Sequence, residues 1–144
     1  MLTKHPRMFV RTLDDVRASG RELVIAGGTA RTARFLTASD GVGFAFSDVH
    51  QGAGGEAHLW YKHHWEANYI LEGTGEVEEV ATGRRWRLAP GTIYVVGPED
   101  RHIVRAETDL HLVSVFNPPI EGDENHDADG SYPPTGPIPP GPAA

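Results

Sequence analysis

The chain contains no cysteine among its 144 residues. Neither disulfides nor thiolate ligands are therefore available, so any bound metal must be held by nitrogen and oxygen atoms. No run of Lys and Arg could neutralise several phosphates, and the net charge of −7 repels nucleic acid and anionic membranes. Apolar runs long enough for a membrane span or a secretory signal are also missing. We therefore expect a cytoplasmic protein that binds neither nucleic acid nor a membrane.

Short segments separated by turn residues make up most of the chain, which is long enough for one domain with one core. One short helix is predicted between Thr12 and Ser19, because Thr12 can cap it and Gly20 follows its end. The predicted strands are 22–25, 32–36, 43–49, 57–62, 67–71, 76–80, 84–88, 93–96, 102–106 and 110–116. This pattern predicts an all-β fold, a barrel or a sandwich.

The last part of the chain has a different composition. Residues 121–132 are acidic and polar but carry Glu124 and His126, which favours a lid or a loop beside a metal over an inert linker. The final twelve residues, 133–144, contain six prolines and are expected to form an extended or disordered tail without chemistry. The predicted domain therefore spans residues 1–132.

Three residues in the middle of the chain are candidates for holding a metal. Glu66 enters a strand whose continuation is apolar, so its carboxylate needs a partner if it is buried; the alternative is a water-exposed strand end. Tyr94 lies in a β-rich run, where a tyrosine ordinarily packs in the core with a hydrogen-bonded hydroxyl. His102 follows a proline-containing turn, where a histidine is ordinarily solvated. A carboxylate, a phenol and an imidazole together can bind a hard or borderline metal.

Motifs around these residues resemble those of the L-ectoine synthases, a family of the cupin superfamily. The likeness runs from about Phe9 to Tyr132. Its most specific parts are Val42-Gly-Phe-Ala-Phe, Tyr61-Lys-His-His-Trp-Glu, Gly73-Thr-Gly-Glu-Val-Glu, Pro90-Gly-Thr-Ile-Tyr, Glu99-Asp-Arg-His, Val115-Phe-Asn-Pro-Pro and His126-Asp-Ala-Asp-Gly-Ser-Tyr. The resemblance implies a single cupin-type, jelly-roll-like β-barrel. Cupins ordinarily place a His-x-His pair before the glutamate, and a tyrosine ligand would explain why that pair is missing here.

The resemblance also implies a reaction and a cofactor. Iron(II) would be held by Glu66, Tyr94 and His102, although this donor set accepts other divalent ions too. The enzyme would be a carbon–oxygen lyase that cyclises N-γ-acetyl-L-2,4-diaminobutyrate, a small amino-acid derivative, to ectoine with loss of water. A homodimer is implied as well, because the family forms homodimers and cupin barrels commonly pair through edge strands.

Further positions correspond to the family's substrate pocket, and all of them except Ser114 match it in kind. The acid and base candidates are Tyr61, His64, Glu124 and His126, and the substrate-binding candidates are Arg34, Ser114 and Phe116. Arg34 suits a substrate carboxylate because a guanidinium can hold it in a bidentate fork.

Three pocket positions depart from the family's pattern. Ala30 replaces a tryptophan, Val49 a threonine and Ser114 a cysteine. They leave two alternatives open. One is a related cyclase or hydro-lyase that acts on another small amino-acid derivative, and the other is a cupin that binds a small ligand without catalysis.

Overall fold

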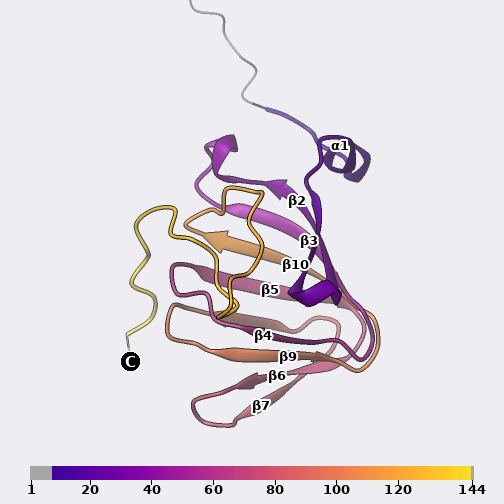
Figure 1. Ribbon diagram of the computed structural model, residues 1–144, viewed down its shortest axis with the longest axis vertical. Helices are drawn as coiled ribbons and strands as arrows, with labels where there is room; N and C mark the ends of the chain where they lie inside the picture. Colours follow the sequence, from indigo (N-terminus) through magenta and orange to yellow (C-terminus); the bar gives the residue numbers. More distant parts are fainter. Residues whose placement is uncertain (1–7, 144) are drawn as a thin grey trace, which may run out of the picture.

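The computed structural model describes residues 8–143 (Figure 1). The predicted short helix is confirmed as α1 (Leu13–Ala18), and it begins at a reciprocal capping box. Thr12 Oγ1 accepts a hydrogen bond from Asp15 N–H at 3.1 Å, and the Asp15 carboxylate accepts one from Thr12 N–H at 2.8 Å. Two 3₁₀ turns, η1 (Ala26–Gly28) and η2 (Ala38–Asp40), lie before and after the strand at residues 30–36. Within residues 8–143 no helix has the length and apolar character needed to cross a membrane.

Ten strands follow within the described range, and each predicted strand has a counterpart. They are β1 (Glu22–Ile25), β2 (Ala30–Leu36), β3 (Ala45–Gln51), β4 (Glu56–Leu59), β5 (Trp65–Glu72), β6 (Gly75–Glu79), β7 (Arg85–Leu88), β8 (Ile93–Val96), β9 (His102–Ala106) and β10 (Leu110–Asn117). The all-β prediction is therefore confirmed.

The strands form two antiparallel sheets. Buried residues of both sheets share one apolar cluster, so the inner faces of the sheets pack against each other. The larger sheet has the order β1-β2-β3-β10-β5-β8, and the smaller has the order β4-β9-β6-β7. Strands far apart in the sequence are thus neighbours, as where β10 pairs with β3 on one side and β5 on the other. This arrangement is a jelly-roll-like barrel with an interior between the sheets.

Alternation along the strands decides what faces that interior. In β10, Leu110, Leu112, Ser114 and Phe116 are buried, whereas the residues between them are partly exposed. The buried side chains form two clusters. One is purely aliphatic, around Ile70. The other contains aromatic rings that come from β10 and from the segments after β4 and β10.

Strands β6 and β7 form a hairpin. Its register pairs Glu76 with Arg87 and Glu78 with Arg85. Arg85 Nη2 lies 3.2 Å from the Glu78 carboxylate. Gly83 supplies the positive φ of 72° that the connecting turn requires. Opposite charges across the strands therefore support the register.

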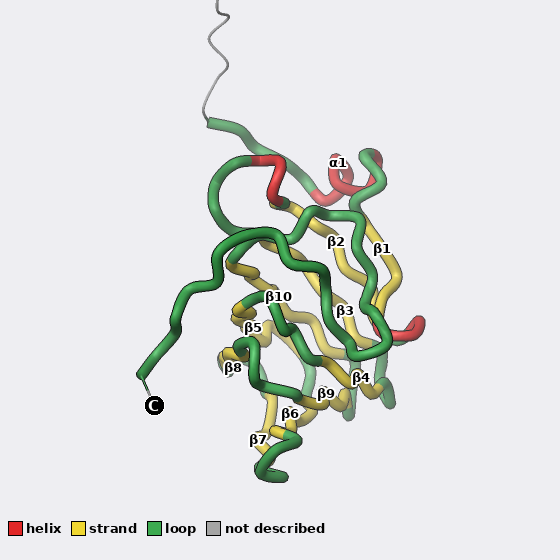
Figure 2. The backbone as a smooth tube through the Cα atoms, turned by 60° about the vertical axis from the view of Figure 1, so that its left-hand side comes forward, coloured by secondary structure: helices red, strands yellow, loops and turns green. Residues whose placement is uncertain are grey.

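The segment after β10 is a long irregular loop that lies on one side of the strands (Figure 2). Strand β4 ends at Leu59, whereas the sequence predicted its end at residue 62. The residues after it pair with this loop instead of a strand: Trp60 N–H donates to Gly130 O at 2.9 Å, and Lys62 N–H donates to Ser131 Oγ at 3.1 Å. Farther along, Trp65 Nε1–H donates to Pro139 O at 2.7 Å. The proline-rich residues thus lie against the barrel.

Candidate metal and substrate site

One cavity occupies the barrel interior, and residues from both sheets and from the C-terminal loop line it. Several of the predicted site residues are brought together there. The lining includes Arg34, Tyr61, Glu66, Tyr94, Ser114, Phe116 and His126. Side chains from strands as distant in sequence as β2 and β10 therefore meet at one place.

Glu66 is buried, with 5% of its surface exposed, and it is the first member of a hydrogen-bonded chain. Asn68 Nδ2–H donates to Glu66 Oε1 at 2.8 Å, and Ser114 Oγ–H donates to Asn68 Oδ1 at 2.7 Å. Glu66 and Asn68 share the inner face of β5 because they are two residues apart. Burial raises the pKa of Glu66 to about 8, so a carboxylate here needs a cation.

Tyr94 and His102 lie near each other on two other strands, and Tyr94 lines the same cavity as Glu66. Tyr94 on β8 lies directly opposite Asn68 in the sheet register, and its ring centroid is 6.3 Å from that of His102 on β9. His102 Nδ1–H donates to Asp100 O at 2.8 Å. Its buried Nε2 has no hydrogen-bond partner within residues 8–143. Burial lowers the pKa of His102, which keeps this nitrogen unprotonated at neutral pH.

These observations fit a divalent metal ion. A neutral imidazole whose Nδ1–H is fixed by a carbonyl presents its Nε2 lone pair as a ligand, as metal-binding histidines ordinarily do. The Glu66 carboxylate and the Tyr94 hydroxyl supply oxygen donors of the kind that suit hard or borderline cations. Burial, and then the nearby Glu66, raise the pKa of Tyr94 well above its ordinary value. A bound cation would oppose that shift and favour the phenolate.

Arg34 is a buried cation beside the same cavity, with 1% of its surface exposed. One of its donors, Nη2–H, is used by Tyr132 OH at 3.1 Å. Its Nε and Nη1 have no hydrogen-bond partner in the described chain, although Nη1 is 3.7 Å from the Glu124 carboxylate. A buried guanidinium with free donors is suited to an anionic ligand.

Glu124 is held in place by the backbone of its own loop. Its carboxylate accepts hydrogen bonds from Glu121 N–H at 2.7 Å and from Gly122 N–H at 2.6 Å. Burial alone would raise the pKa of Glu124, but these N–H groups and the charge of Arg34 lower it. Glu124 is therefore an ionised partner of Arg34 and a weak base.

Tyr61 and His126 form a hydrogen-bonded pair on the cavity wall. Tyr61 OH and His126 Nε2 are 2.9 Å apart. Burial, and then the charge of Arg34, lower the pKa of His126 to about 4, so its ring is neutral at neutral pH. Burial, and then Glu66, raise the pKa of Tyr61 well above its ordinary value, so Tyr61 keeps its proton at neutral pH. The aromatic rings of Phe116 and Tyr132 pack on Tyr61 at centroid distances of 5.0 Å and 5.3 Å.

His64, a candidate acid or base, lies outside the cavity lining. It is fully buried, with Nδ1 2.8 Å from Pro118 O and Nε2 3.1 Å from Pro133 O. Its ring packs edge-on against Phe116 at 5.7 Å. Both nitrogens therefore face carbonyls of the C-terminal segment, which suits a role in positioning that segment.

Two cavity residues with hydrogen bonds to site residues were not among the sequence candidates. Asn68 could have been found from its place two residues after Glu66 on a strand. Tyr132 gave no such signal, because its contact with Arg34 joins residues 98 positions apart. The three positions that depart from the family's pattern, Ala30, Val49 and Ser114, all line the cavity.

The sequence of residues 8–136 matches the family model described as ectoine synthase. The L-ectoine synthase of Oceanobacillus iheyensis is 45% identical over 126 residues, which cover 88% of this chain and 97% of that protein. The L-ectoine synthase of Halomonas elongata is 41% identical over 127 residues, with 88% and 93% covered.

Solved structures agree with these relatives. The crystal structure of ectoine synthase from P. lautus matches with a TM-score of 0.77 at 37% identity, and 94% of this chain and 96% of that one are covered. A cupin 2 conserved barrel domain protein from Salinispora arenicola matches with a TM-score of 0.61 at 20% identity over 76% and 87% of the chains, which supports the fold alone. The predicted cupin-type barrel is confirmed, and it is compatible with a divalent metal ion.

Proposed function

This chain belongs to the ectoine synthase family, and we propose that it closes N-γ-acetyl-L-2,4-diaminobutyrate into the cyclic amidine ectoine with loss of water. It is a carbon–oxygen lyase that acts on a small molecule. One structural observation carries the proposal. Several buried polar side-chain atoms have no hydrogen-bond partner in the described chain. They belong to Arg34, Ser47, Gln51, His102 and His126. All of these residues except His102 line the cavity. Unpaired buried polar groups are costly, so a polar ligand is expected to complete them.

Glu66, Tyr94 and His102 would hold the metal, and we propose iron(II) as its identity. Three protein ligands leave coordination positions open for a substrate. When bound, such an ion supplies a Lewis acid for the poorly electrophilic amide carbonyl. Asn68 and Ser114 hold Glu66 in position through the hydrogen-bonded chain. In this proposal Ser114 acts through Asn68 as well as lining the substrate cavity.

Arg34 would bind the substrate carboxylate. Its Nε and Nη1 have no hydrogen-bond partner within residues 8–143, so these N–H groups are free to donate to such a carboxylate. Tyr132 OH accepts a hydrogen bond from Arg34 Nη2–H and the Glu124 carboxylate is 3.7 Å from Nη1, so these two residues position Arg34. Phe116 and Tyr61 supply aromatic walls that keep the acyclic chain folded, which raises the effective concentration of the amine at the carbonyl.

The Tyr61–His126 pair would move the protons. The substrate amine must be unprotonated to form the new carbon–nitrogen bond, and it then gives up two protons while the amide oxygen departs as water. His126 is neutral at neutral pH and lies 2.9 Å from the Tyr61 hydroxyl, so a proton can pass between them. We assign acid and base roles to this pair, and positioning roles to Glu124 and to His64.

Edge strands of the larger sheet offer a route to the proposed homodimer. The edges are β1 and β8. Val24 on β1 is 55% exposed, and Ile93 and Val95 on β8 are 60% and 54% exposed. Apolar edge strands can pair with a second copy of the chain. Sedimentation of the protein as a monomer at micromolar concentration would contradict this assignment.

A second candidate function is cyclisation of another small amino-acid derivative. It is favoured by Ala30 and Val49, since these two departures from the family's pattern lie on the cavity wall. Turnover of a panel of acylated diamino acids would separate the two functions. A strong preference for a substrate other than N-γ-acetyl-diaminobutyrate would favour this candidate.

The metal assignment is tested by metal content. Glu66→Ala, Tyr94→Phe and His102→Ala should each lose bound iron(II) after anaerobic reconstitution and gel filtration, while circular dichroism remains that of the wild type. His58→Ala is a matched control because His58 is 66% exposed on β4. Wild-type iron content in all three variants would remove the assignment.

A further inference from the structure

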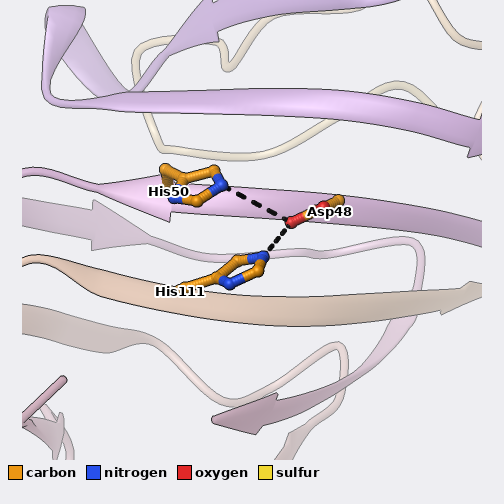
Figure 3. Close-up of side chains that lie close together, drawn as sticks. All are labelled: Asp48, His50 and His111. Atoms are coloured by element: carbon orange, nitrogen blue, oxygen red, sulfur yellow. Dashed lines mark hydrogen bonds and ion pairs between the residues drawn. The ribbon is translucent and has the colours of Figure 1, made fainter. Parts of the chain in front are cut away.

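The outer face of the larger sheet carries a second group of metal-binding side chains (Figure 3). Asp48 and His50 lie two residues apart on β3, so they project from the same face. His111 on the neighbouring strand β10 is directly opposite His50 in the register. Val49, between Asp48 and His50, and Leu112, next to His111, line the internal cavity. The group therefore lies on the opposite face of the sheet from Glu66.

The three ligand atoms already converge. His111 Nε2 is 2.5 Å from Asp48 Oδ1, and His50 Nε2 is 3.8 Å from the same oxygen. All three lie within 4.8 Å of one another. The two imidazole rings are stacked with centroids 4.1 Å apart and an interplanar angle of 9°. One imidazole must turn out of this stack for both nitrogens and the carboxylate to lie about 2.1 Å from one ion, the ordinary length of a zinc–nitrogen bond.

We propose that Asp48, His50 and His111 form a second metal site, which takes a borderline divalent ion such as Zn²⁺. Two imidazoles and one carboxylate are donors that suit such ions. Strands in the middle of a six-stranded sheet hold the backbone of all three residues, so little conformational entropy is lost on binding.

Surrounding charges and exposure define the kind of site. Arg31 on β2 is opposite His50, and Glu72 on β5 is opposite His111, so the neighbouring cation and anion offset each other. The His50 side chain is 60% exposed, whereas those of Asp48 and His111 are about one-quarter exposed. An ion here would be open to solvent and would keep positions for water or for a small anionic ligand. It would also link β3 to β10 on the outside of the barrel.

The number of bound ions tests the site. Chelator-treated wild-type protein and a His50→Ala/His111→Ala double variant would be dialysed against micromolar Zn²⁺, and the zinc bound per chain measured by mass spectrometry. We expect the double variant to bind one fewer ion per chain than the wild type. Any zinc held by Glu66, Tyr94 and His102 contributes equally to both proteins, so the difference does not depend on the proposed function.

Two further variants serve as controls for this measurement. Asp48→Asn keeps the shape of the side chain but removes its charge, and it should weaken Zn²⁺ binding at this site even if the double variant folds poorly. His58→Ala removes a histidine of similar exposure on the other sheet and should leave the zinc count unchanged. Equal zinc content in wild type, Asp48→Asn and the double variant would overturn the proposal, as would an equal loss in His58→Ala.

Discussion

Arg34 is the residue whose chemistry most restricts the ligand. It is buried, it is held by Glu124 and Tyr132, and it keeps free donors at Nε and Nη1. Arg34→Lys keeps the charge but loses the fork, so we expect KM for the substrate to rise roughly 10- to 100-fold, as for the loss of a charged hydrogen bond of about 1.5–3 kcal/mol. The change in kcat should be smaller. Steady-state kinetics measure both, and an unchanged KM would show that Arg34 does not bind the carboxylate.

Asn68 is expected to position Glu66 rather than to bind metal. Asn68→Ala removes the hydrogen bond to Glu66 Oε1, and loss of such an outer partner typically lowers metal affinity about 10- to 100-fold. Ser114→Ala removes only the next link and should have a smaller effect. Competition with a fluorescent chelator gives the affinities. If Ser114→Ala weakens metal binding more than Asn68→Ala does, Ser114 does not act on Glu66 through Asn68.

The position of the C-terminal loop against β4 depends on Gly130. Gly130 has a φ of 73°, and a Cβ there would lie 2.3 Å from His58 O. Gly83 has a φ of 72° but open space around it. Both Gly→Ala changes introduce backbone strain of about 1–2 kcal/mol, but only Gly130→Ala should also displace the loop that carries His126 and Tyr132. We expect kcat and Tm to fall more in Gly130→Ala than in Gly83→Ala, as measured by turnover and calorimetry. Equal effects would contradict a docked loop.

Asp40 joins η2 to the residues that precede α1 and β1. Its carboxylate is 3.0 Å from Arg11 Nη2 and 3.3 Å from Arg21 Nη1, and it accepts a hydrogen bond from Thr37 N–H at 2.9 Å. Burial alone would raise the pKa of Asp40, but these partners lower it below the ordinary 3.8. At neutral pH, Asp40→Asn should lower the free energy of unfolding by about 1–3 kcal/mol.

The pH dependence of this effect has a defined sign. A folded-state pKa below the unfolded value means that the stabilisation by Asp40 is complete above the unfolded pKa of 3.8 and is lost as pH falls through the folded pKa. The free energies of unfolding of wild type and Asp40→Asn, measured with urea, should therefore differ at pH 7, and the difference should shrink as the pH falls below 3.8. Glu99→Gln, at an exposed position, is the control for loss of charge alone. A difference in the free energy of unfolding that became larger at acidic pH would contradict the predicted direction of the pH dependence.

Secondary structure was largely predictable because local signals set it. The Thr12 cap, the turn at Gly83 and the alternation of β10 each act within a few residues. The end of β4 was not predictable, since Trp60 and Lys62 pair with residues about 70 positions later. The contacts of the proline-rich tail with Trp65 were missed for the same reason.

At the scale of the whole molecule, the overall fold creates the site. Arg34 lies on β2, Glu66 on β5 and His126 in the C-terminal loop, and only the folding of the whole chain brings them to one cavity. Composition and spacing alone could identify a carboxylate, a phenol and an imidazole as candidates but could not show that they meet. The family resemblance supplied that step, and the free Nε2 of His102 supplies the physical support for it.

The most direct test of the account is turnover of N-γ-acetyl-L-2,4-diaminobutyrate by anaerobically purified protein reloaded with iron(II). Nuclear magnetic resonance would follow the cyclic amidine, with the metal-free protein as control. The account predicts ectoine formation that depends on the added metal. No ectoine from folded, iron-loaded protein, or equal rates with and without metal, would contradict it.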